Sequence, residues 1–221
     1  MSALTREQMA WRAAQDLPNG SYVNLGVGIP TLIPKHIPVG REVIIHSENG
    51  VLGMGPAPVL GTEDRDLIDA GRGFATLVAG GVYMHHADSF IIIRGGHLDV
   101  SLMGAFEVSE HGDLANWTTE DPGFPPAVGG AMDLAVGARQ IRVLMDHTSK
   151  SGEPRIRRRC TLPLTAAGVV RRIYTNLALV DVTPEGLLVR EIVADMDLQK
   201  LQALTEAHLI LAPDCGRLAP P

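Results

Sequence analysis

Short apolar runs that end in glycines recur along this chain, and they constrain its fold more than any other feature. Segments with helical spacing of apolar residues lie between many of these runs. Runs that are apolar throughout are typical of strands buried on both faces, and alternation of strands with helices favours a parallel arrangement. The sequence therefore predicts an α/β fold, a mostly parallel open sheet with helices on both faces.

Capping and turn signals place individual elements. Thr5 and Gln8 match a capping box for a helix over 5–17, and Thr183-Pro184-Glu185-Gly186 predicts a turn between two strands within 171–193. We expect a polar surface loop over 149–160. The other expected strands are 21–25, 42–46, 74–81, 98–109, 141–147 and 208–212, and the other expected helices are 31–38, 85–96 (beginning near Asp88), 131–138 and 195–207.

The length of 221 residues suits one large α/β domain or two smaller ones. No repeat, low-complexity segment or clear linker interrupts the chain, so we expect a single domain over 1–221 with a frayed tail from about 213. The basic run 155–159 has two interpretations, a solvated loop or an anion site, and we favour the solvated loop.

Charge and composition exclude several classes of function. Lys and Arg number 19 against 25 Asp and Glu, a net charge of −6, which argues against nucleic acid or an anionic membrane as partner. The N-terminal segment has no apolar core of a signal peptide, and no run approaches the ~18 apolar residues of a membrane span. The two cysteines form no CxxC pair and fit a reducing compartment, so we expect a cytoplasmic protein.

The stretch 46–56, HSENGVLGMGP, is the first candidate for chemistry. Asn49-Gly50 between apolar runs predicts a tight turn, because both residues tolerate positive φ. That turn does not require Glu48. The residue is either a surface carboxylate or, held on a sharp turn among free backbone N–H groups, a base or nucleophile. Ligands bind at the carboxyl ends of strands in open α/β sheets, where glycines such as Gly26, Gly28, Gly129 and Gly130 allow close approach.

Other patterns are weaker. GVGIPT matches a dinucleotide-binding loop only in part. The histidine pair 85–86 has no third residue at a spacing typical of metal ligands, so we expect no metal site. The histidine pair is also explained by a polar helix start, and His97 and Asp99 by a structural strand face. The titratable candidates are Glu48, His85, His86, Asp88, Arg94, His97 and Asp99.

Five blocks in order carry a family resemblance: VNLGVGIP, HSENGVLGMGP, ADSFIIIRGGHLDV, GDLANW and VGGAMDLAVGA. Together they resemble the B subunit of the two-subunit CoA transferases of 3-oxo acids, and the similarity runs from about residue 5 to about 212. The resemblance implies a CoA-transferase fold and a ping-pong transfer through a covalent glutamyl-CoA intermediate.

The resemblance also assigns residues. It implies that Glu48 is the nucleophile, that Asn24 lies near the reacting centre, and that Gly129 and Gly130 belong to a loop at the CoA thioester. Arg72 stands where the family often has lysine, and the two side chains are not interchangeable. The expected residues for binding CoA or substrate are Asn24, Gly26, Gly28, Asn49, Gly50, Arg72, Gly129 and Gly130.

By the same resemblance, the partner is an A subunit in a heterodimer or heterotetramer, and CoA esters are substrates, with no resident cofactor. HHADSF and PAVGGAMDLAVGARQ most resemble the enzymes that act on 3-oxoadipate with succinyl-CoA as donor. Both acids carry a second carboxylate, for which the cationic candidates are Arg72, His85, His86 and Arg94. The alternatives are a transferase for acetoacetate, a CoA-thioester hydrolase, and a non-catalytic sugar-phosphate-binding or regulatory domain.

Overall fold

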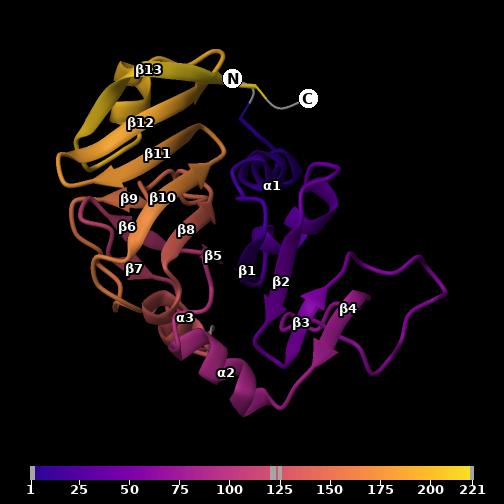
Figure 1. Cartoon of the computed structure of the whole chain (residues 1–221). Helices are drawn as coiled ribbons and strands as arrows, with labels where there is room; N and C mark the ends of the chain where they lie inside the picture. The colour runs from indigo at the N-terminus through magenta and orange to yellow at the C-terminus, as the bar shows by residue number, and fades with distance from the viewer. Residues whose placement is uncertain (1–2, 120–122, 124–125, 220–221) are drawn as a thin grey trace.

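The computed structural model describes residues 3–119, 123 and 126–219 (Figure 1). Ten of the described strands form one sheet, in the order β13-β12-β11-β10-β8-β5-β1-β2-β3-β4, and three form a smaller one, β7-β6-β9. The large sheet comprises β1 (Ser21–Leu25), β2 (Val43–Ser47), β3 (Val51–Met54), β4 (Leu77–Tyr83), β5 (Val100–Gly104), β8 (Gln140–Met145), β10 (Val170–Thr175), β11 (Ala178–Thr183), β12 (Gly186–Val193) and β13 (Leu209–Leu218).

The centre of the large sheet is parallel and its flanks are partly antiparallel. Strands β2, β1, β5, β8 and β10 pair in parallel, whereas β3 and β4 on one side and β11 and β12 on the other continue the sheet antiparallel. The last strand, β13, is parallel to β12. The predicted α/β fold with a mostly parallel open sheet is therefore confirmed, with antiparallel hairpins added outside the parallel centre.

Two hydrophobic cores lie on opposite faces of this sheet, because successive side chains of a strand point to opposite sides. Leu102 and Leu144 pack with α1 (Arg6–Gln15) and the 3₁₀ helix η1 (Ile29–His36), whereas their neighbours Met103 and Val143 pack on the other face. That second face is covered by α2 (His86–Arg94), α3 (Ala131–Gly137), α4 (Leu198–Ala203) and the small sheet of β6 (Glu107–Ser109), β7 (Leu114–Ala115) and β9 (Ile156–Arg157).

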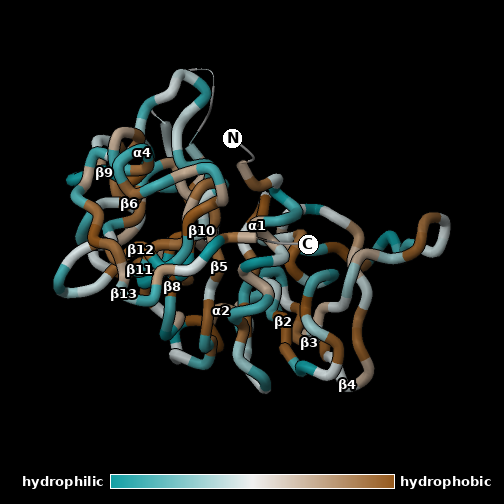
Figure 2. The backbone as a smooth tube through the Cα atoms, turned by 90° about the horizontal axis from the view of Figure 1, so that it is seen from above, coloured by the Kyte–Doolittle hydropathy of each residue, from teal (hydrophilic) through white to brown (hydrophobic). Residues whose placement is uncertain are grey.

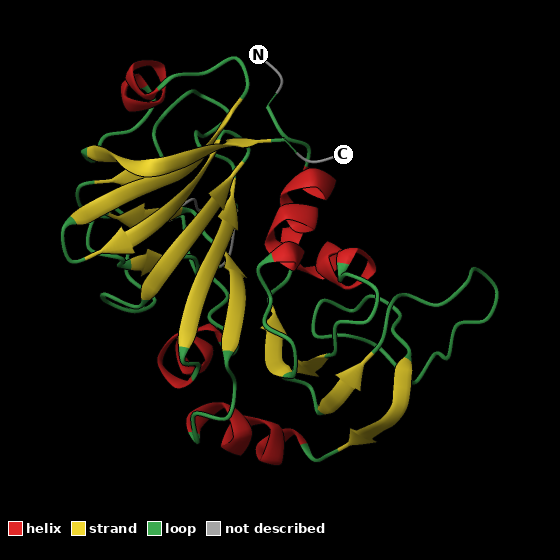
Figure 3. Ribbon diagram, turned by 45° about the horizontal axis from the view of Figure 1, so that its top comes forward, coloured by secondary structure: helices red, strands yellow, loops and turns green. Residues whose placement is uncertain are grey.

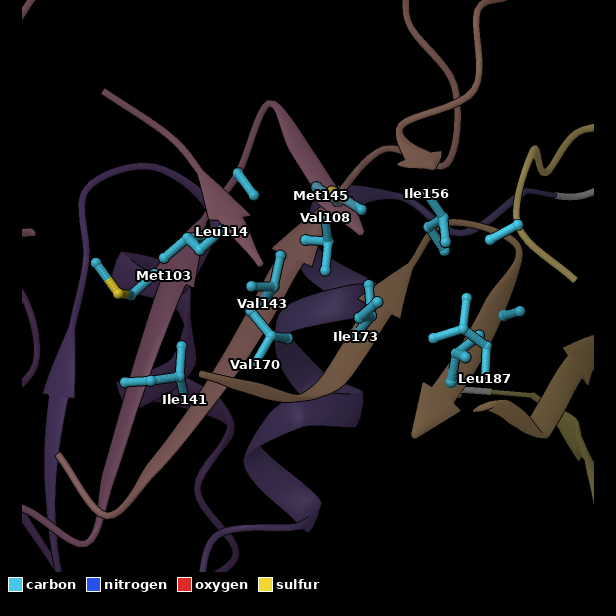
Figure 4. Close-up of a cluster of buried hydrophobic side chains, with 14 of the residues drawn as sticks. Met103, Val108, Leu114, Ile141, Val143, Met145, Ile156, Val170, Ile173 and Leu187 are labelled. Carbon is cyan, nitrogen blue, oxygen red and sulfur yellow. The ribbon is translucent and has the colours of Figure 1, made fainter. Parts of the chain in front are cut away.

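Figure 3 shows helices on either side of the curved run of strands, and Figure 4 shows side chains of the second core. In Figure 4, Val108, Leu114 and Ile156 from the small sheet approach Val143 and Ile173 of the large one. Helices on both faces were expected from the strands that are apolar throughout. The small sheet as a further covering layer was not.

The first helix confirms its predicted start. Gln8 N donates to Thr5 Oγ1 at 3.2 Å and Thr5 N donates to Gln8 Oε1 at 3.1 Å, which is the reciprocal capping box. The helix ends at Gln15, two residues before the expected end. Helix α2 begins at His86 with His85 as its N-cap, rather than near Asp88, and α4 is shorter than the predicted 195–207.

Two predicted segments divide into more strands than expected. Residues 98–109 form β5 and β6, which belong to different sheets. Residues 171–193 contain parts of three strands, because the chain also reverses after Thr175. There the Thr175 hydroxyl accepts the N–H groups of Leu177 and Ala178 at 3.1 and 2.9 Å. A threonine turn of this kind needs neither glycine nor proline, so the usual turn signal is missing.

The prediction of a frayed tail from about 213 is wrong for the residues up to 218. They continue β13 beside β12, with Glu191, Ile192 and Val193 opposite Gly216, Arg217 and Leu218. Backbone pairing orders this polar segment, and the sequence pattern does not reveal backbone pairing. Residues 220 and 221 of the predicted tail lie outside the described part of the chain.

The solvated loop predicted for 149–160 is also wrong in part. Ile156 is buried in β9, and the neighbouring Arg157 forms ion pairs with Glu107 at 2.6 Å and Glu206 at 3.2 Å. Arg158 and Arg159 are exposed, as expected of a basic loop. A single buried apolar residue between arginines is too short a pattern to identify a strand.

The connection between β3 and β4, residues 55–76, projects from the body of the molecule (Figure 1). Hydrophobic residues lie close to its tip (Figure 2). Within this connection, Val59 and Leu60 are 76 and 93 % exposed. Among the described helices, none is both long and apolar enough to cross a bilayer.

His147 ties the segment after β8 to two other elements. It is fully buried, with Nδ1 3.0 Å from Thr175 Oγ1 and Nε2 2.8 Å from Thr205 Oγ1. Burial disfavours the charged imidazolium and lowers the pKa of His147 to about 4. The folded protein therefore holds this histidine neutral at pH values where the unfolded chain protonates it.

We predict that the free energy of unfolding falls as the pH drops from about 6.5 towards 4, because the unfolded state binds a proton that the folded state refuses. One such histidine contributes up to about 3 kcal/mol over this window. Urea unfolding at several pH values measures the slope, and His147→Gln, which cannot titrate there, should bind about one proton fewer on unfolding. An unchanged slope in His147→Gln would contradict this assignment.

Candidate active site

Glu48 lies in the turn that follows β2. Gly50 N donates to Ser47 O at 3.0 Å to close the turn, and Met84 N donates to Gly50 O at 2.9 Å. Gly50 has φ of 111°, and a Cβ atom there would overlap the backbone carbonyl of Met84. Position 50 therefore requires glycine for two reasons, and the Asn-Gly signal correctly located the turn.

The carboxylate of Glu48 rests against Gly130, the residue that precedes α3. A Cβ atom on Gly130 would overlap Glu48 Oε2 and come within 3.0 Å of Phe90 Cζ. The side chain is half-buried, and no described residue donates a hydrogen bond to it. Desolvation raises the pKa of Glu48, the nearby His86 lowers it, and Asp133 raises it further. The Glu48 carboxylate therefore contacts neighbouring groups but forms no hydrogen bond with any described residue.

A cavity of about 850 Å³ opens beside Glu48. Its volume falls in the upper part of the range for ligand pockets, which is about 300–1,000 Å³. Most of the residues expected from the sequence to bind CoA or substrate line it. They are Asn24, Gly26, Gly28, Arg72, Gly129 and Gly130, together with Glu48 itself.

Asn49 and Gly50 do not line this cavity, although they were expected at the binding site. Their place in the structure assigns them to the turn itself. Gly50 closes it, and Asn49 Nδ2 donates to Ile68 O at 2.7 Å, which fastens the β3–β4 connection beside Glu48. Both residues therefore shape the surroundings of the carboxylate.

Arg72 is the one described residue other than glycine with a positive φ, 67°. Such a conformation costs a non-glycine residue about 1 kcal/mol or more, and it is often found at functional sites. Its guanidinium makes no ion pair with any described residue, and the same is true of Arg6 and Arg155, which line the same cavity. No sequence pattern pointed to Arg6, and Arg155 was expected in a solvated loop.

The remaining cationic candidates are in three different situations. His86 lies close enough to Glu48 to influence its pKa, and its ring contacts Phe90 edge-on at 4.8 Å between centroids. His85 accepts the N–H of Ala87 through Nδ1 at 3.1 Å, so it caps α2. Arg94 is exposed, pairs with Asp133 at 2.6 Å and does not line the cavity.

The other titratable candidates do not meet at the cavity. Asp99 accepts the N–H of Tyr22 at 2.9 Å and pairs with Arg139 at 2.9 Å, and the ring of His97 packs against Gly95. These contacts are structural, but both residues precede β5, which begins at Val100, so the expected strand face is wrong. Across the described ranges, no three His, Cys, Asp or Glu side chains gather in a way that could hold a metal ion.

His46 belongs to the HSENG stretch, and the sequence predicted no role for it. It is fully buried directly behind the Glu48 turn, with Nδ1 3.1 Å from Asn24 Nδ2 and Nε2 2.8 Å from Ser89 Oγ. Burial lowers the pKa of His46 to about 4, so the ring is neutral near pH 7. Only the pairing of β1 with β2 and the position of α2 bring these three residues together.

Comparison with known proteins finds a family match over most of the chain. Residues 6–196 match the family described as Coenzyme A transferase. The B subunit of 3-oxoadipate CoA-transferase from Pseudomonas putida is 56 % identical over 207 residues, which cover 94 % of this chain and 97 % of that protein. The B subunit of the probable succinyl-CoA:3-ketoacid coenzyme A transferase from Bacillus subtilis is 46 % identical over 208 residues, 94 % of this chain and 95 % of that one.

Solved structures share the fold at low sequence identity. The acyl-CoA transferase YdiF of Escherichia coli O157:H7 superposes with a TM-score of 0.75 at 20 % identity, over 98 % of this chain. The match spans 44 % of the YdiF chain, less than half of its length. Glutaconate coenzyme A-transferase of Acidaminococcus fermentans gives a TM-score of 0.71 at 15 % identity, over 100 % of this chain and 91 % of that one.

We predict that Gly130→Ala pushes the Glu48 carboxylate towards solvent, because the added Cβ overlaps Oε2. The raised pKa of Glu48 should then fall towards its ordinary value. A ¹³C NMR titration of the glutamate carboxyl groups measures this pKa, with Glu48→Gln to assign the signal. Gly104→Ala is the matched control, since its Cβ would meet only Val27 O at 3.8 Å in the same cavity. An unchanged titration in Gly130→Ala would show that the contact does not hold the carboxylate.

Proposed function

This chain belongs to the coenzyme A transferase family, and on that premise we propose that it is the B subunit of an enzyme that transfers CoA from succinyl-CoA to 3-oxoadipate, with Glu48 as the covalent nucleophile. The observation that carries the proposal is the half-buried Glu48 carboxylate, free of hydrogen bonds from the described residues, at the wall of a cavity of about 850 Å³. A free carboxylate needs no base to become a nucleophile.

The reaction proceeds in two balanced halves. One oxygen of Glu48 attacks the thioester carbonyl of succinyl-CoA, the C–S bond breaks, and a mixed anhydride and CoA thiolate form. The thiolate then attacks the Glu48 carbonyl, which leaves a glutamyl-CoA thioester and free succinate. The carboxylate of 3-oxoadipate reverses both steps and departs as its CoA thioester.

These steps make two demands on the cavity. An anhydride hydrolyses in water, so the reacting atoms need a site from which water is excluded when substrate is bound. CoA is large and most of it lies far from the thioester, so its binding energy can drive the anhydride steps. Gly130 lies directly against the carboxylate, and the absence of a side chain there leaves Glu48 its place at the cavity wall.

The identity of the acids rests on the relatives together with the charges of the cavity. Succinate and 3-oxoadipate both keep a remote carboxylate while the first carries CoA. Arg6, Arg72 and Arg155 line the cavity together with the acids Glu48 and Asp146, and none of the three arginines forms an ion pair with a described acid. A charge-assisted hydrogen bond from such a group is worth about 1.5–3 kcal/mol, or roughly ten- to a hundredfold in discrimination. His86, close to Glu48, is a further candidate, whereas the contacts of His85 and Arg94 give them other roles.

We also propose an A subunit as partner, because the relatives are named as B subunits of their enzymes. The assembled enzyme would be the active form, in the cytoplasm, with CoA esters as substrates and no resident cofactor. The number of A and B subunits is a separate question that the mass of the purified complex answers.

We predict that the assembled enzyme, incubated with succinyl-CoA and no acceptor, accumulates CoA on Glu48. Peptide mass spectrometry locates the adduct, and borohydride should reduce the thioester and abolish activity. Glu48→Ala should form no adduct while it folds and assembles normally, and Glu48→Asp should lose roughly 100-fold, because its carboxylate is set back by one methylene. An adduct on another residue, or turnover in Glu48→Ala, would exclude the proposed nucleophile.

We predict a higher kcat/KM for 3-oxoadipate than for acetoacetate, each with succinyl-CoA as donor. The cation that binds the remote carboxylate is identified by three variants, Arg6→Ala, Arg72→Ala and Arg155→Ala. Its loss should lower the ratio of kcat/KM for 3-oxoadipate to kcat/KM for acetoacetate about tenfold or more. Arg94→Ala is the matched control, because Arg94 pairs with Asp133 outside the cavity. If acetoacetate is the better acceptor, the chain instead belongs to a 3-ketoacid transferase.

A further inference from the structure

Three buried polar side chains form a continuous hydrogen-bonded chain behind the turn that carries Glu48. Asn24 comes from β1, His46 from the adjacent β2, and Ser89 from α2, and they are 2, 0 and 0 % exposed. We propose that His46 is a positioning residue that connects β1 to α2 and holds the Glu48 turn in its reactive position. This inference rests on the proposed role of Glu48.

The donors and acceptors fix the direction of each hydrogen bond in this network. Asn24 Nδ2, a donor, lies 3.2 Å from the His46 carbonyl and 3.1 Å from His46 Nδ1. The carbonyl always accepts, and Nδ1 accepts when the ring is neutral with its proton on Nε2. Nε2 then donates to Ser89 Oγ at 2.8 Å, and the Ser89 hydroxyl donates to the carbonyl of Ser47 at 3.3 Å. The hydrogen-bond network thus ends at the carbonyl of Ser47, the residue immediately before Glu48.

Ser47 is held from three sides by these contacts. Its carbonyl accepts from Ser89 and from Gly50 N, and its hydroxyl accepts the N–H of Ala70 at 3.2 Å. The adjacent Glu48 makes no hydrogen bond of its own to described residues, so the backbone of the turn, together with the contact with Gly130, places its carboxylate. A misplacement of about 1 Å at a reacting group can cost roughly 100-fold in rate.

The amide of Asn24 adds a second argument. Its Oδ1 atom is buried with no partner among the described residues. Turning the amide over would place Oδ1 against the His46 carbonyl, so the strand pairing fixes this orientation. An unsatisfied buried acceptor is destabilising, and such an arrangement is expected where function rather than stability decides the structure.

His147 provides a matched control within the same chain. Like His46, it is fully buried with a pKa lowered to about 4, and both of its ring nitrogens contact hydroxyl groups. It does not line the cavity, and its hydrogen bonds go to Thr175, Thr205, Asn176 and the backbone N–H of Arg155 rather than to Glu48 or its turn. A histidine that serves packing alone should behave in mutagenesis as His147 does.

The test compares His46→Gln with His46→Leu in the enzyme assembled with its A subunit. Glutamine keeps the order of acceptor and donor, because Oε1 can accept from Asn24 while Nε2 donates to Ser89. Leucine keeps similar bulk and loses both bonds. We expect His46→Leu to slow single-turnover formation of the Glu48–CoA adduct and kcat roughly 10- to 100-fold with KM for succinyl-CoA within about threefold, and His46→Gln to recover most of the rate.

Ser89→Ala removes one oxygen atom and should slow the same step, which keeps the test open if His46→Leu does not fold. His147→Leu should lower the melting temperature and leave adduct formation at the wild-type rate. Wild-type rates in His46→Leu or Ser89→Ala, no recovery in His46→Gln, or an equal loss in His147→Leu would each overturn the inference. Absence of any Glu48 adduct in the wild-type enzyme would instead overturn the proposed function.

Discussion

A carboxylate that is half-buried yet receives no hydrogen bond from the described residues is the constraint on which the site depends. Burial raises the pKa of Glu48, the nearby His86 offsets this only in part, and no hydrogen bond from the described residues replaces the lost hydration. The surrounding structure therefore has to hold it in place. The turn closed by Gly50, the bare backbone of Gly130 and the buried contacts of Ser47 all serve that purpose.

The position of the site follows from the sheet. Strands β1 and β2 are parallel neighbours in its centre, so their carboxyl ends lie together and present Asn24 and Glu48 at one edge. The end of β5 and the loop before α3 reach the same cavity, which adds Gly104 and Gly130. Ligand sites at the carboxyl ends of strands are the general rule for open α/β sheets. Here the antiparallel flanks leave that parallel centre intact.

The sequence predicted those features that depend on local signals. The Thr5 capping box, the Asn-Gly turn and the apolar strands can each be identified within a few residues, and the fold class followed from them. The threonine turn after Thr175, the pairing of the residues before 219 and the strand at Ile156 depend on distant backbone partners, and they were missed. In the site, Glu48 could be singled out because Asn49 and Gly50 account for the turn, and the turn does not require a glutamate. Arg6, His46 and Ser89 carry no local signal, whereas Asn24 was expected at the site from the family resemblance.

The parallel register between β1 and β2 places Asn24 opposite His46, and side chains on a strand alternate between its two faces. A single residue inserted into either strand would therefore turn one of the two to the wrong side of the sheet. The connection between η1 and β2 is a loop and has no such restriction. In this region, insertions or deletions are tolerable in the connections but not in the strands. Geometry therefore fixes the number of residues between Asn24 and the end of β1, and between His46 and Glu48. The identity of the neighbouring residues is not fixed in the same way.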